Sequence, residues 1–242
     1  MGEINLRRAK LLSLEVEPDE KFHEVYWITL EGERRLATRN LTPGRTVYGE
    51  RLVRFGGVEY RLWNPFRSKL AAAVLNGLRN MPINEGGQIL YLGAATGTTP
   101  SHVSDIVGAE GSVYCVEFAP RVFRELIVNV CKYRENMFPI LADARNPELY
   151  SMLVGSVSVV YCDVAQPEQA SILAENANMY LEEEGWALLA VKARSIDAAK
   201  SLRRIYRMEK ETLEKHGFTV EEEVKLEPYD KAHELIVSRR MK

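Results

Sequence analysis

The feature that most constrains the fold of this chain is the alternation, from Phe66 onward, of short apolar segments with longer helical segments. Almost continuously apolar strands separated by helices are typical of a doubly wound, mostly parallel α/β sheet. Seven strands are predicted, at Gln88–Leu92, Ser112–Glu117, Met137–Leu141, Val157–Cys162, Ala187–Lys192, Phe218–Val224 and His233–Ser238. No helix separates the last two, which indicates an antiparallel edge on an otherwise Rossmann-like sheet.

The segments between these strands have helical composition, and several begin or end at residues that commonly bound helices. Pro120 opens one of them and Gly217 follows the last. The predicted helices are Arg67–Leu78, Thr99–Val107, Ala119–Tyr133, Pro167–Tyr180 and Ile196–His216.

The first part of the chain has a different pattern, with short β-like segments separated by Gly and Pro. Strands are predicted at Leu11–Glu17, Glu24–Leu30, Arg35–Arg39 and Val58–Trp63. We therefore expect a small N-terminal antiparallel β domain over residues 1–58 and a larger α/β domain over residues 59–242.

Composition excludes several classes of protein. The 242 residues are 46% hydrophobic and 27% charged, as in ordinary globular proteins, and the net charge of −2 argues against coating nucleic acid by bulk charge. The three cysteines show no metal-ligand spacing, so we expect reduced, buried thiols and no metal site. The sequence has no apolar run long enough for a membrane span and no signal-peptide core, which favours a cytoplasmic protein without membrane contact.

The loop after the first strand of the large sheet is a candidate binding site. Its residues, Gly93-Ala94-Ala95-Thr96-Gly97-Thr98-Thr99, are small and lead into a helix whose first N–H groups are free. The loop is neither a GxGxxG dinucleotide motif nor a phosphate-binding P-loop. Taken alone it is equally compatible with a tight strand-to-helix turn.

Charged residues follow four further strands, where ligands of such sheets bind. Glu117 stands about 20 positions after the loop, as a ribose-binding acid would. Asp143 could hold an adenine amino group, and Asp163 and Lys192 end the next two strands. Each could be a solvated charge, but the set favours an adenosine-type ligand. The missing glycines disfavour a dinucleotide, so S-adenosylmethionine is the preferred cofactor.

Longer motifs resemble those of the fibrillarin family, in particular its archaeal fibrillarin-like form, over nearly the whole chain. The similar segments are RNLTPGRTVYGERLV (39–53), WNPFRSKLAAA (63–73), YLGAATGTT (91–99), SHVSDIVG (101–108), VEFAPR (116–121), DAR (143–145), DVAQPEQA (163–170) and VKARSID (191–197). The Gly/Arg-rich extension of eukaryotic fibrillarins is absent from this sequence.

The resemblance implies an S-adenosylmethionine-dependent 2′-O-methyltransferase, the catalytic subunit of a box C/D ribonucleoprotein. In such particles a guide RNA selects the ribose in rRNA or tRNA, a Nop-family scaffold protein docks the subunit, and a kink-turn-binding protein holds the guide. The activity belongs to rRNA and tRNA processing. The cofactor-binding residues that we expect, including the loop, are Gly93, Ala94, Thr98, Thr99, Glu117, Phe118, Asp143, Ala144, Asp163, Val164, Ala165 and Gln166.

Related ribose methyltransferases use a Lys-Asp-Lys arrangement, which the resemblance places on Lys69, Asp163 and Lys192. A 2′-hydroxyl needs a proton acceptor and nearby positive charge to become a nucleophile. We expect Lys192 to lie nearest the 2′-oxygen, Asp163 to orient it and Lys69 to supply a second cation. Without the resemblance, Lys69 would be taken as a solvated helix lysine.

Further residues carry weaker expectations. Arg67, Arg145 and Arg194 are candidates for contact with RNA phosphates, although a lone arginine is more often a surface charge. His102 is expected on the surface of its helix. The runs Glu182–Glu184 and Glu221–Glu223 are expected in solvated turns.

Three alternatives remain open at this point. The chain could methylate a protein, for example at glutamine, or could be a non-catalytic assembly subunit of the particle. The presence of Lys69, Asp163 and Lys192 argues against the second. A nicotinamide-linked dehydrogenase is disfavoured because GxGxxG is missing, although an α/β sheet alone does not decide the chemistry.

Overall fold

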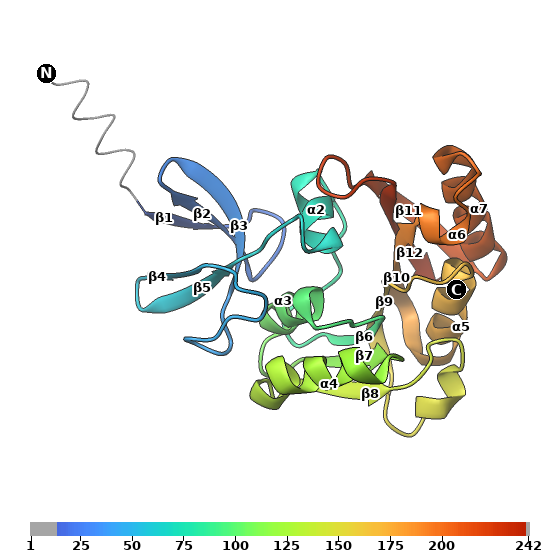
Figure 1. Cartoon of the computed structure of the whole chain (residues 1–242), viewed down its shortest axis with the longest axis horizontal. Coiled ribbons are helices and arrows are strands. Elements are labelled where there is room, and N and C mark those ends of the chain that lie inside the picture. The colour runs from blue at the N-terminus through green and yellow to red at the C-terminus, as the bar shows by residue number, and fades with distance from the viewer. Residues whose placement is uncertain (1–13, 241–242) are drawn as a thin grey trace, which may run out of the picture.

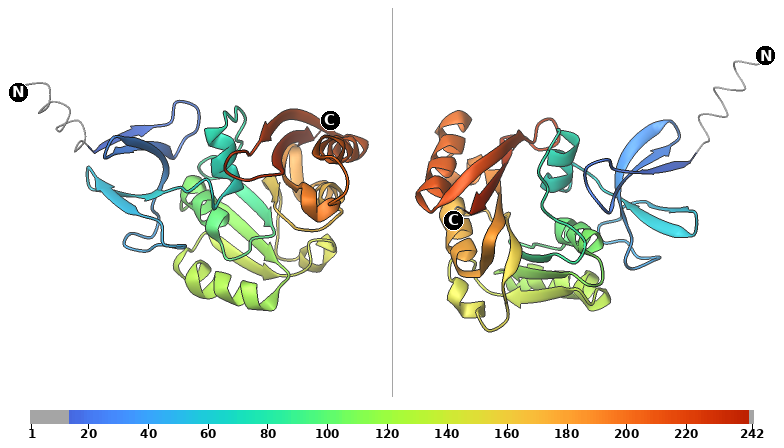
Figure 2. Two further views of the ribbon diagram at one scale, coloured as in Figure 1. Left: turned by 45° about the horizontal axis from the view of Figure 1, so that its top comes forward. Right: turned by 180° about the vertical axis from the view of Figure 1, so that it is seen from behind.

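The computed structural model describes residues 14–240 and contains two β-sheets side by side (Figures 1 and 2). The strands of the larger sheet are β6 (Gln88–Leu92), β7 (Ser112–Glu117), β8 (Met137–Leu141), β9 (Val157–Cys162), β10 (Leu181–Lys192), β11 (Phe218–Lys225) and β12 (His233–Arg240). Their order is β11-β12-β10-β9-β6-β7-β8. Strands β6 to β10 pair in parallel, whereas β12 runs antiparallel to β10 and to β11. The predicted doubly wound sheet with an antiparallel edge is confirmed.

Helices cover both faces of this sheet (Figure 2). They are α2 (Lys69–Leu75), α3 (Thr98–Val107), α4 (Pro120–Asn129), α5 (Gln169–Tyr180), α6 (Ala193–Ile196) and α7 (Leu202–Lys215), with 3₁₀ turns η1 (Cys131–Tyr133) and η2 (Pro147–Tyr150). Leu70, Val103 and Leu126 of α2, α3 and α4 belong to the core on one face. Leu173 of α5 and Leu213 of α7 belong to the core on the other. Burial on both faces explains why the strands are almost continuously apolar.

The single helix predicted over Ile196–His216 is wrong, because the chain breaks between α6 and α7. The Asp197 side chain accepts hydrogen bonds from the backbone N–H groups of Ala199 and Lys200, at 2.8 and 3.2 Å. An aspartate that binds nearby backbone groups competes with helical hydrogen bonding, which accounts for the interruption.

The two glutamate runs lie in strands rather than in the expected turns. Glu182–Glu184 belong to the first half of β10, and Glu221–Glu223 to β11. In β11 buried and exposed positions alternate, so Glu222 turns inward while its neighbours face solvent. The Glu222 carboxylate accepts a hydrogen bond from the backbone N–H of Arg79 at 2.9 Å and pairs with its guanidinium at 3.3 Å.

The smaller sheet is antiparallel, as predicted, but extends past the predicted domain boundary at residue 58. Its strands are β1 (Glu15–Pro18), β2 (Val25–Leu30), β3 (Glu33–Arg39), β4 (Leu52–Phe55) and β5 (Val58–Leu62), in the order β1-β2-β3-β5-β4. Strand β5 pairs with both β3 and β4, so this sheet ends at Leu62. Strand β4 was not predicted. The first residues of the predicted strand Leu11–Glu17 lie outside the described residues.

Helix α3 joins the two sheets, and this overturns the surface position expected for His102. The imidazole is fully buried. Its Nδ1 lies 2.7 Å from the Thr38 hydroxyl and its Nε2 lies 2.8 Å from the Tyr48 hydroxyl. The ring also stacks on Trp63, with centroids 5.0 Å apart. Burial, with Arg61 and Arg134 nearby, holds the pKa of His102 well below its usual value.

Asp105, one turn further along α3, is the centre of a buried ionic network. Its carboxylate pairs with Arg61 of β5 at 2.8 Å and with Arg134 at 2.6 Å. Arg61 also pairs with Glu50 at 2.7 Å and donates to the Ser101 hydroxyl at 2.9 Å. Asp105, Arg61, Arg134 and Glu50 are all buried, and each forms at least one ion pair. Removing one of these charges would leave another buried without a partner, so the network ties the small sheet to α3.

The three cysteines are free and buried, as expected. Within residues 14–240, no helix has the length and apolar character needed to cross a membrane. The same residues contain no cluster of three or more His, Cys, Asp or Glu side chains suited to a metal ion.

Candidate active site

The carboxyl ends of the central parallel strands surround a cavity of about 340 Å³. Parallel strands end at the same edge of a sheet, so their following loops meet there. The cavity is lined by nine of the residues expected to bind cofactor: Gly93, Glu117, Phe118, Asp143, Ala144, Asp163, Val164, Ala165 and Gln166. Lys192 lines it as well, whereas the sequence did not single out Ala119, Val122 or Ile172.

Gly93 lets two strand ends approach closely. Its φ is +81°, and a Cβ atom there would lie 2.8 Å from the carbonyl oxygen of Asp163. The N–H groups of Gly93 and Ala94 both donate to the carbonyl of Val116, at 2.9 and 3.0 Å. The loop is thus tied to β7 while leaving an open backbone surface at the cavity, which only glycine permits at this position.

Glu117 is held at the end of β7 by backbone donors. Its Oε2 accepts the N–H of Ala95 at 3.0 Å, and its Oε1 accepts the N–H of Ala119 at 2.9 Å. Only 7% of the residue is exposed. Each oxygen keeps a lone pair for a further donor, so the carboxylate is positioned to accept two hydroxyl groups of a ribose.

The next strand end carries Asp143 and Ala144. A hydrogen bond from Arg145, at 2.6 Å between Nη2 and Oδ2, lowers the pKa of Asp143. Because the guanidinium of Arg145 already pairs with Asp143, it is less available to bind an RNA phosphate. Phe118, 60% exposed, presents its ring at the rim of the cavity.

Three residues of the predicted cofactor set do not line the cavity: Ala94, Thr98 and Thr99. Ala94 belongs to the loop, but its side chain is buried. Thr98 is the first residue of α3. The Thr99 hydroxyl donates to the Ser68 hydroxyl at 3.0 Å, and Ser68 caps α2. Thr99 therefore links the loop to the helix that begins with Lys69.

At the side of the cavity two lysines converge on one carboxylate. Lys69 Nζ lies 3.1 Å and Lys192 Nζ lies 3.0 Å from Oδ1 of Asp163. Lys192 also donates to the Asp163 backbone carbonyl at 2.6 Å. All three side chains are mostly buried. The predicted Lys-Asp-Lys set is therefore assembled, from the start of α2 and the ends of β9 and β10.

Comparison with known proteins identifies the family. The fibrillarin family model matches residues 16–242 of the chain. The chain belongs to the fibrillarin family. A fibrillarin-like rRNA/tRNA 2′-O-methyltransferase of Pyrobaculum calidifontis is 56% identical over 229 residues, 94% of this chain and 98% of the relative. The one of Staphylothermus marinus is 55% identical over 225 residues, 93% and 96%.

Two solved fibrillarin structures show the same fold. That of Aeropyrum pernix fibrillarin with natively bound S-adenosyl-L-methionine has a TM-score of 0.88 and 49% identity, covering 94% of this chain and 99% of that one. A fibrillarin/Nop5p complex has a TM-score of 0.80 and 38% identity, covering 92% and 100%.

We call the cluster of Lys69, Asp163 and Lys192 the lysine–aspartate centre. Two further residues, which the sequence did not single out, extend it. Asp230 Oδ2 lies 3.8 Å from Lys69 Nζ, and Asp230 Oδ1 lies 2.7 Å from His233 Nδ1. Burial acts to raise the pKa of Asp230, but the hydrogen bond and charge of His233, with Lys69 and Lys192, lower it overall. Asp230 is 161 positions from Lys69, so no local sequence signal could have paired them.

The remaining arginine candidates flank the centre. Arg67 stands two residues before Lys69 and is exposed, with its guanidinium 6.0 Å from the Tyr48 ring. Arg194 stands two residues after Lys192, is exposed, and donates to the carbonyl of Ala198 at 2.8 Å. Both remain predictions as phosphate ligands.

Proposed function

We propose that this fibrillarin-family chain is an S-adenosylmethionine-dependent methyltransferase that modifies the ribose 2′-hydroxyl of rRNA and tRNA. The observation that carries the proposal is the convergence of Lys69 and Lys192 on Asp163 beside the cavity. The printed functions of the Pyrobaculum and Staphylothermus relatives and the cofactor of the Aeropyrum structure support it.

The cavity fits an adenosyl group by its own chemistry. Glu117 offers two fixed carboxylate oxygens to a ribose diol, Phe118 offers an aromatic face to a base, and Asp143 offers an acceptor to an amino group. Gly93 provides backbone that no side chain shields. When bound, S-adenosylmethionine supplies an electrophilic methyl group on a positively charged sulfur.

The lysine–aspartate centre prepares the nucleophile. A 2′-hydroxyl must lose its proton as its oxygen attacks, and negative charge develops on that oxygen. In this proposal Lys192 accepts the hydroxyl proton, while the side chain of Lys69 supplies positive charge that stabilises the oxygen. Asp163 holds both nitrogens at about 3 Å and so fixes their positions relative to the substrate.

The wider assembly is part of the same proposal. We expect the chain to work as the catalytic subunit of a box C/D particle, with a guide RNA, a Nop-family scaffold and a kink-turn-binding protein, in rRNA and tRNA processing. The fibrillarin/Nop5p structure of a relative supports the scaffold. Three free thiols are compatible with the reducing cytoplasm, where we expect the chain to act.

The test is a reconstituted methylation assay with labelled S-adenosylmethionine, guide RNA, target RNA and the two partner proteins. Lys192→Ala should lower methylation by about 10²- to 10⁴-fold, because the proton acceptor is removed. Cofactor affinity, measured by calorimetry, should change little. Lys215→Ala at the exposed end of α7 is the matched control and should retain full activity.

The location of the label decides between substrates. Label that ribonuclease releases and protease leaves intact supports RNA methylation. Label that protease removes would move the function to a protein substrate. Full RNA methylation by Lys192→Ala would refute the assigned role of this lysine.

A further inference from the structure

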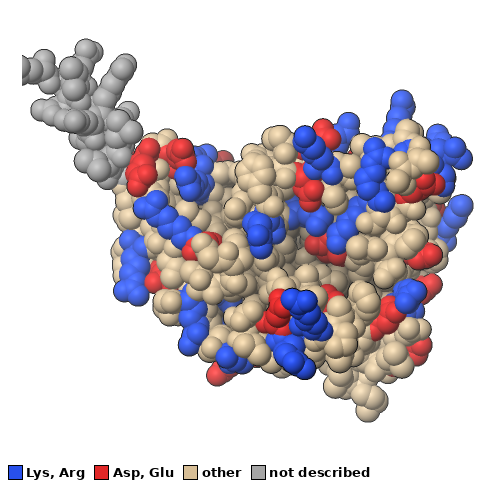
Figure 3. Space-filling view, viewed as in Figure 1, with Lys and Arg blue, Asp and Glu red and all other residues tan. Residues whose placement is uncertain are grey.

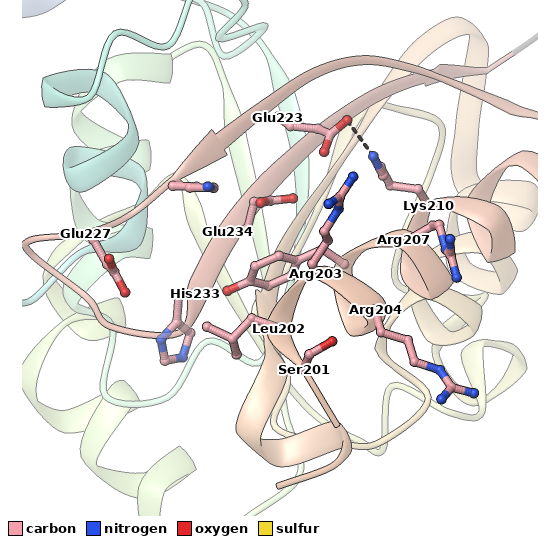
Figure 4. A pocket seen from close by; sticks show the side chains of 12 residues that line it. Ser201, Leu202, Arg203, Arg204, Arg207, Lys210, Glu223, Glu227, His233 and Glu234 are labelled. Atoms are coloured by element: carbon pink, nitrogen blue, oxygen red, sulfur yellow. Dashed lines mark hydrogen bonds and ion pairs between the residues drawn. The ribbon is translucent and has the colours of Figure 1, made fainter. Parts of the chain in front are cut away.

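A second hollow, of about 880 Å³, lies between α7 and the antiparallel strands β11 and β12. Figure 4 shows its two walls, with Arg203, Arg204 and Arg207 on the helix side and Glu223 and Glu234 on the strand side. We name this hollow the α7 groove. None of the cofactor or catalytic residues assigned above lines it.

The helix wall of the α7 groove carries uncompensated positive charge. Lys210 pairs with Glu223 at 2.8 Å, and Arg207 pairs with Glu211 on the outer side at 3.6 Å. Arg203 and Arg204 are exposed and form no ion pair with any residue of the described range 14–240. Figure 3 shows Lys and Arg gathered over this part of the surface, at the upper right. The groove thus attracts an anion although the whole chain has a net charge of −2.

The strand wall offers a buried acceptor without a donor. Glu234 is 4% exposed, and its Oε1 makes no hydrogen bond to any described residue. Burial, then the charge of Glu223 and a hydrogen bond shared with its side chain, raise the pKa of Glu234 to about 7, against the opposing effect of Lys210 and Lys225. An unsatisfied buried polar atom is costly, so a ligand that donates a hydrogen bond there would be favoured.

The α7 groove lies next to the catalytic edge. His233 lines the groove and is the register partner of Lys192 across the β10–β12 pair. The same imidazole contacts Asp230, which in turn approaches Lys69. A polymer whose ribose lies at Lys192 would therefore reach this groove by passing His233.

We propose that the α7 groove binds the RNA strand next to the methylated ribose, an inference that rests on the proposed function. Arg203 and Arg204 contact backbone phosphates, and Glu234 accepts a hydrogen bond from a hydroxyl or amino group of a nucleotide. RNA combines regularly spaced anions with such donors. An acidic protein segment would also match the arginines, but the position of the groove beside Lys192 favours the RNA substrate.

The first arm of the test measures binding of the full chain to a single-stranded oligoribonucleotide of about 12 nucleotides by fluorescence anisotropy over a range of salt. Arg203→Gln/Arg204→Gln should weaken binding about tenfold at low salt and reduce the slope of log affinity against log salt by about 1.4, for two lost phosphate contacts. Arg121→Gln/Arg124→Gln on α4 removes the same charge from another helix and is the matched control.

The second arm tests the acceptor. Glu234→Gln keeps the shape of the side chain and should weaken RNA binding without changing the salt slope, because no phosphate contact is lost. Equal binding by wild type and Arg203→Gln/Arg204→Gln would overturn the proposal, and so would equal weakening by the α4 control. Loss of affinity for the scaffold protein with RNA binding intact would make the groove a protein interface instead.

The two proposals can fail separately. Lys192→Ala tests the reaction and leaves Arg203 and Arg204 in place, so the binding assay remains valid if methylation is not found. Cofactor affinity should be the same in all groove variants, since none of the altered residues lines the cofactor cavity.

Discussion

Asp163 shows how one residue organises the centre. Its Oδ1 faces the Nζ atoms of Lys69 and Lys192 at 3.1 and 3.0 Å, yet neither forms a well-aligned hydrogen bond to it. The contact between the carboxylate and the two lysines is therefore mainly electrostatic. Its backbone carbonyl separately anchors Lys192. The backbone carbonyl of Asp163 thus positions Lys192, while its carboxylate balances the charge of the lysines.

Glu209, also buried, is expected to make stability depend on pH. Its Oε2 accepts the N–H of Ala170 at 3.0 Å, but burial dominates and raises its pKa from 4.5 to about 7. The folded state therefore binds this proton more tightly than the unfolded state. The stabilising contribution is complete below the unfolded pKa and is lost as pH rises through the folded pKa.

Glu209→Gln should remove the loss of stability that follows ionisation of Glu209 at high pH. Relative to wild type, the free energy of unfolding of the variant should rise by about 3 kcal/mol at pH values above about 8, and change little below about pH 4. Denaturant titrations at the two pH values measure the difference. Glu211→Gln, exposed on the same helix, is the control. A pH-independent effect of Glu209→Gln would contradict the assignment.

At the scale of elements, α3 connects three parts of the molecule. Its first turn follows the Gly-rich loop, and Thr99 contacts Ser68, which caps the helix carrying Lys69. His102 and Asp105 then hold the small sheet. The helix that follows the Gly-rich loop of the cavity is thus the one that docks the N-terminal strands.

Asp105→Asn should be strongly destabilising. The change leaves the buried guanidinium of Arg61 with Glu50, and that of Arg134 with no ion-pair partner among residues 14–240. Loss of one partner from a buried ionic network costs about 3–5 kcal/mol, and chemical denaturation measures it. Asp197→Asn, which loses a half-exposed pair with Lys200, should cost about 1 kcal/mol or less. Similar losses in both variants would show that the network does not hold the sheets together.

Across the whole molecule, positive and negative charges nearly cancel, but positive charge is concentrated at the α7 groove. The net charge of −2 gives little counterion release, while the arginines of the α7 groove sit close to the catalytic edge. RNA should therefore be oriented by the chain but retained mainly by its partners.

The isolated chain should accordingly methylate RNA at least about 10²-fold more slowly than the reconstituted particle, because the partners raise the effective concentration of the target. Initial rates of label transfer, with each component omitted in turn, measure this. Comparable rates for the chain alone would show that it selects and retains RNA by itself.

The amino-acid sequence is sufficient to predict the alternation of strands and helices and the acidic residues at the strand ends. Parallel strands end at one edge, so Glu117, Asp143 and Asp163 had to meet there. The burial of His102, and the contacts that bring Asp230 and His233 to Lys69, become visible only in the folded chain. Those pairings depend on how helices and distant strands pack, and contacts between residues far apart in the chain leave no local pattern.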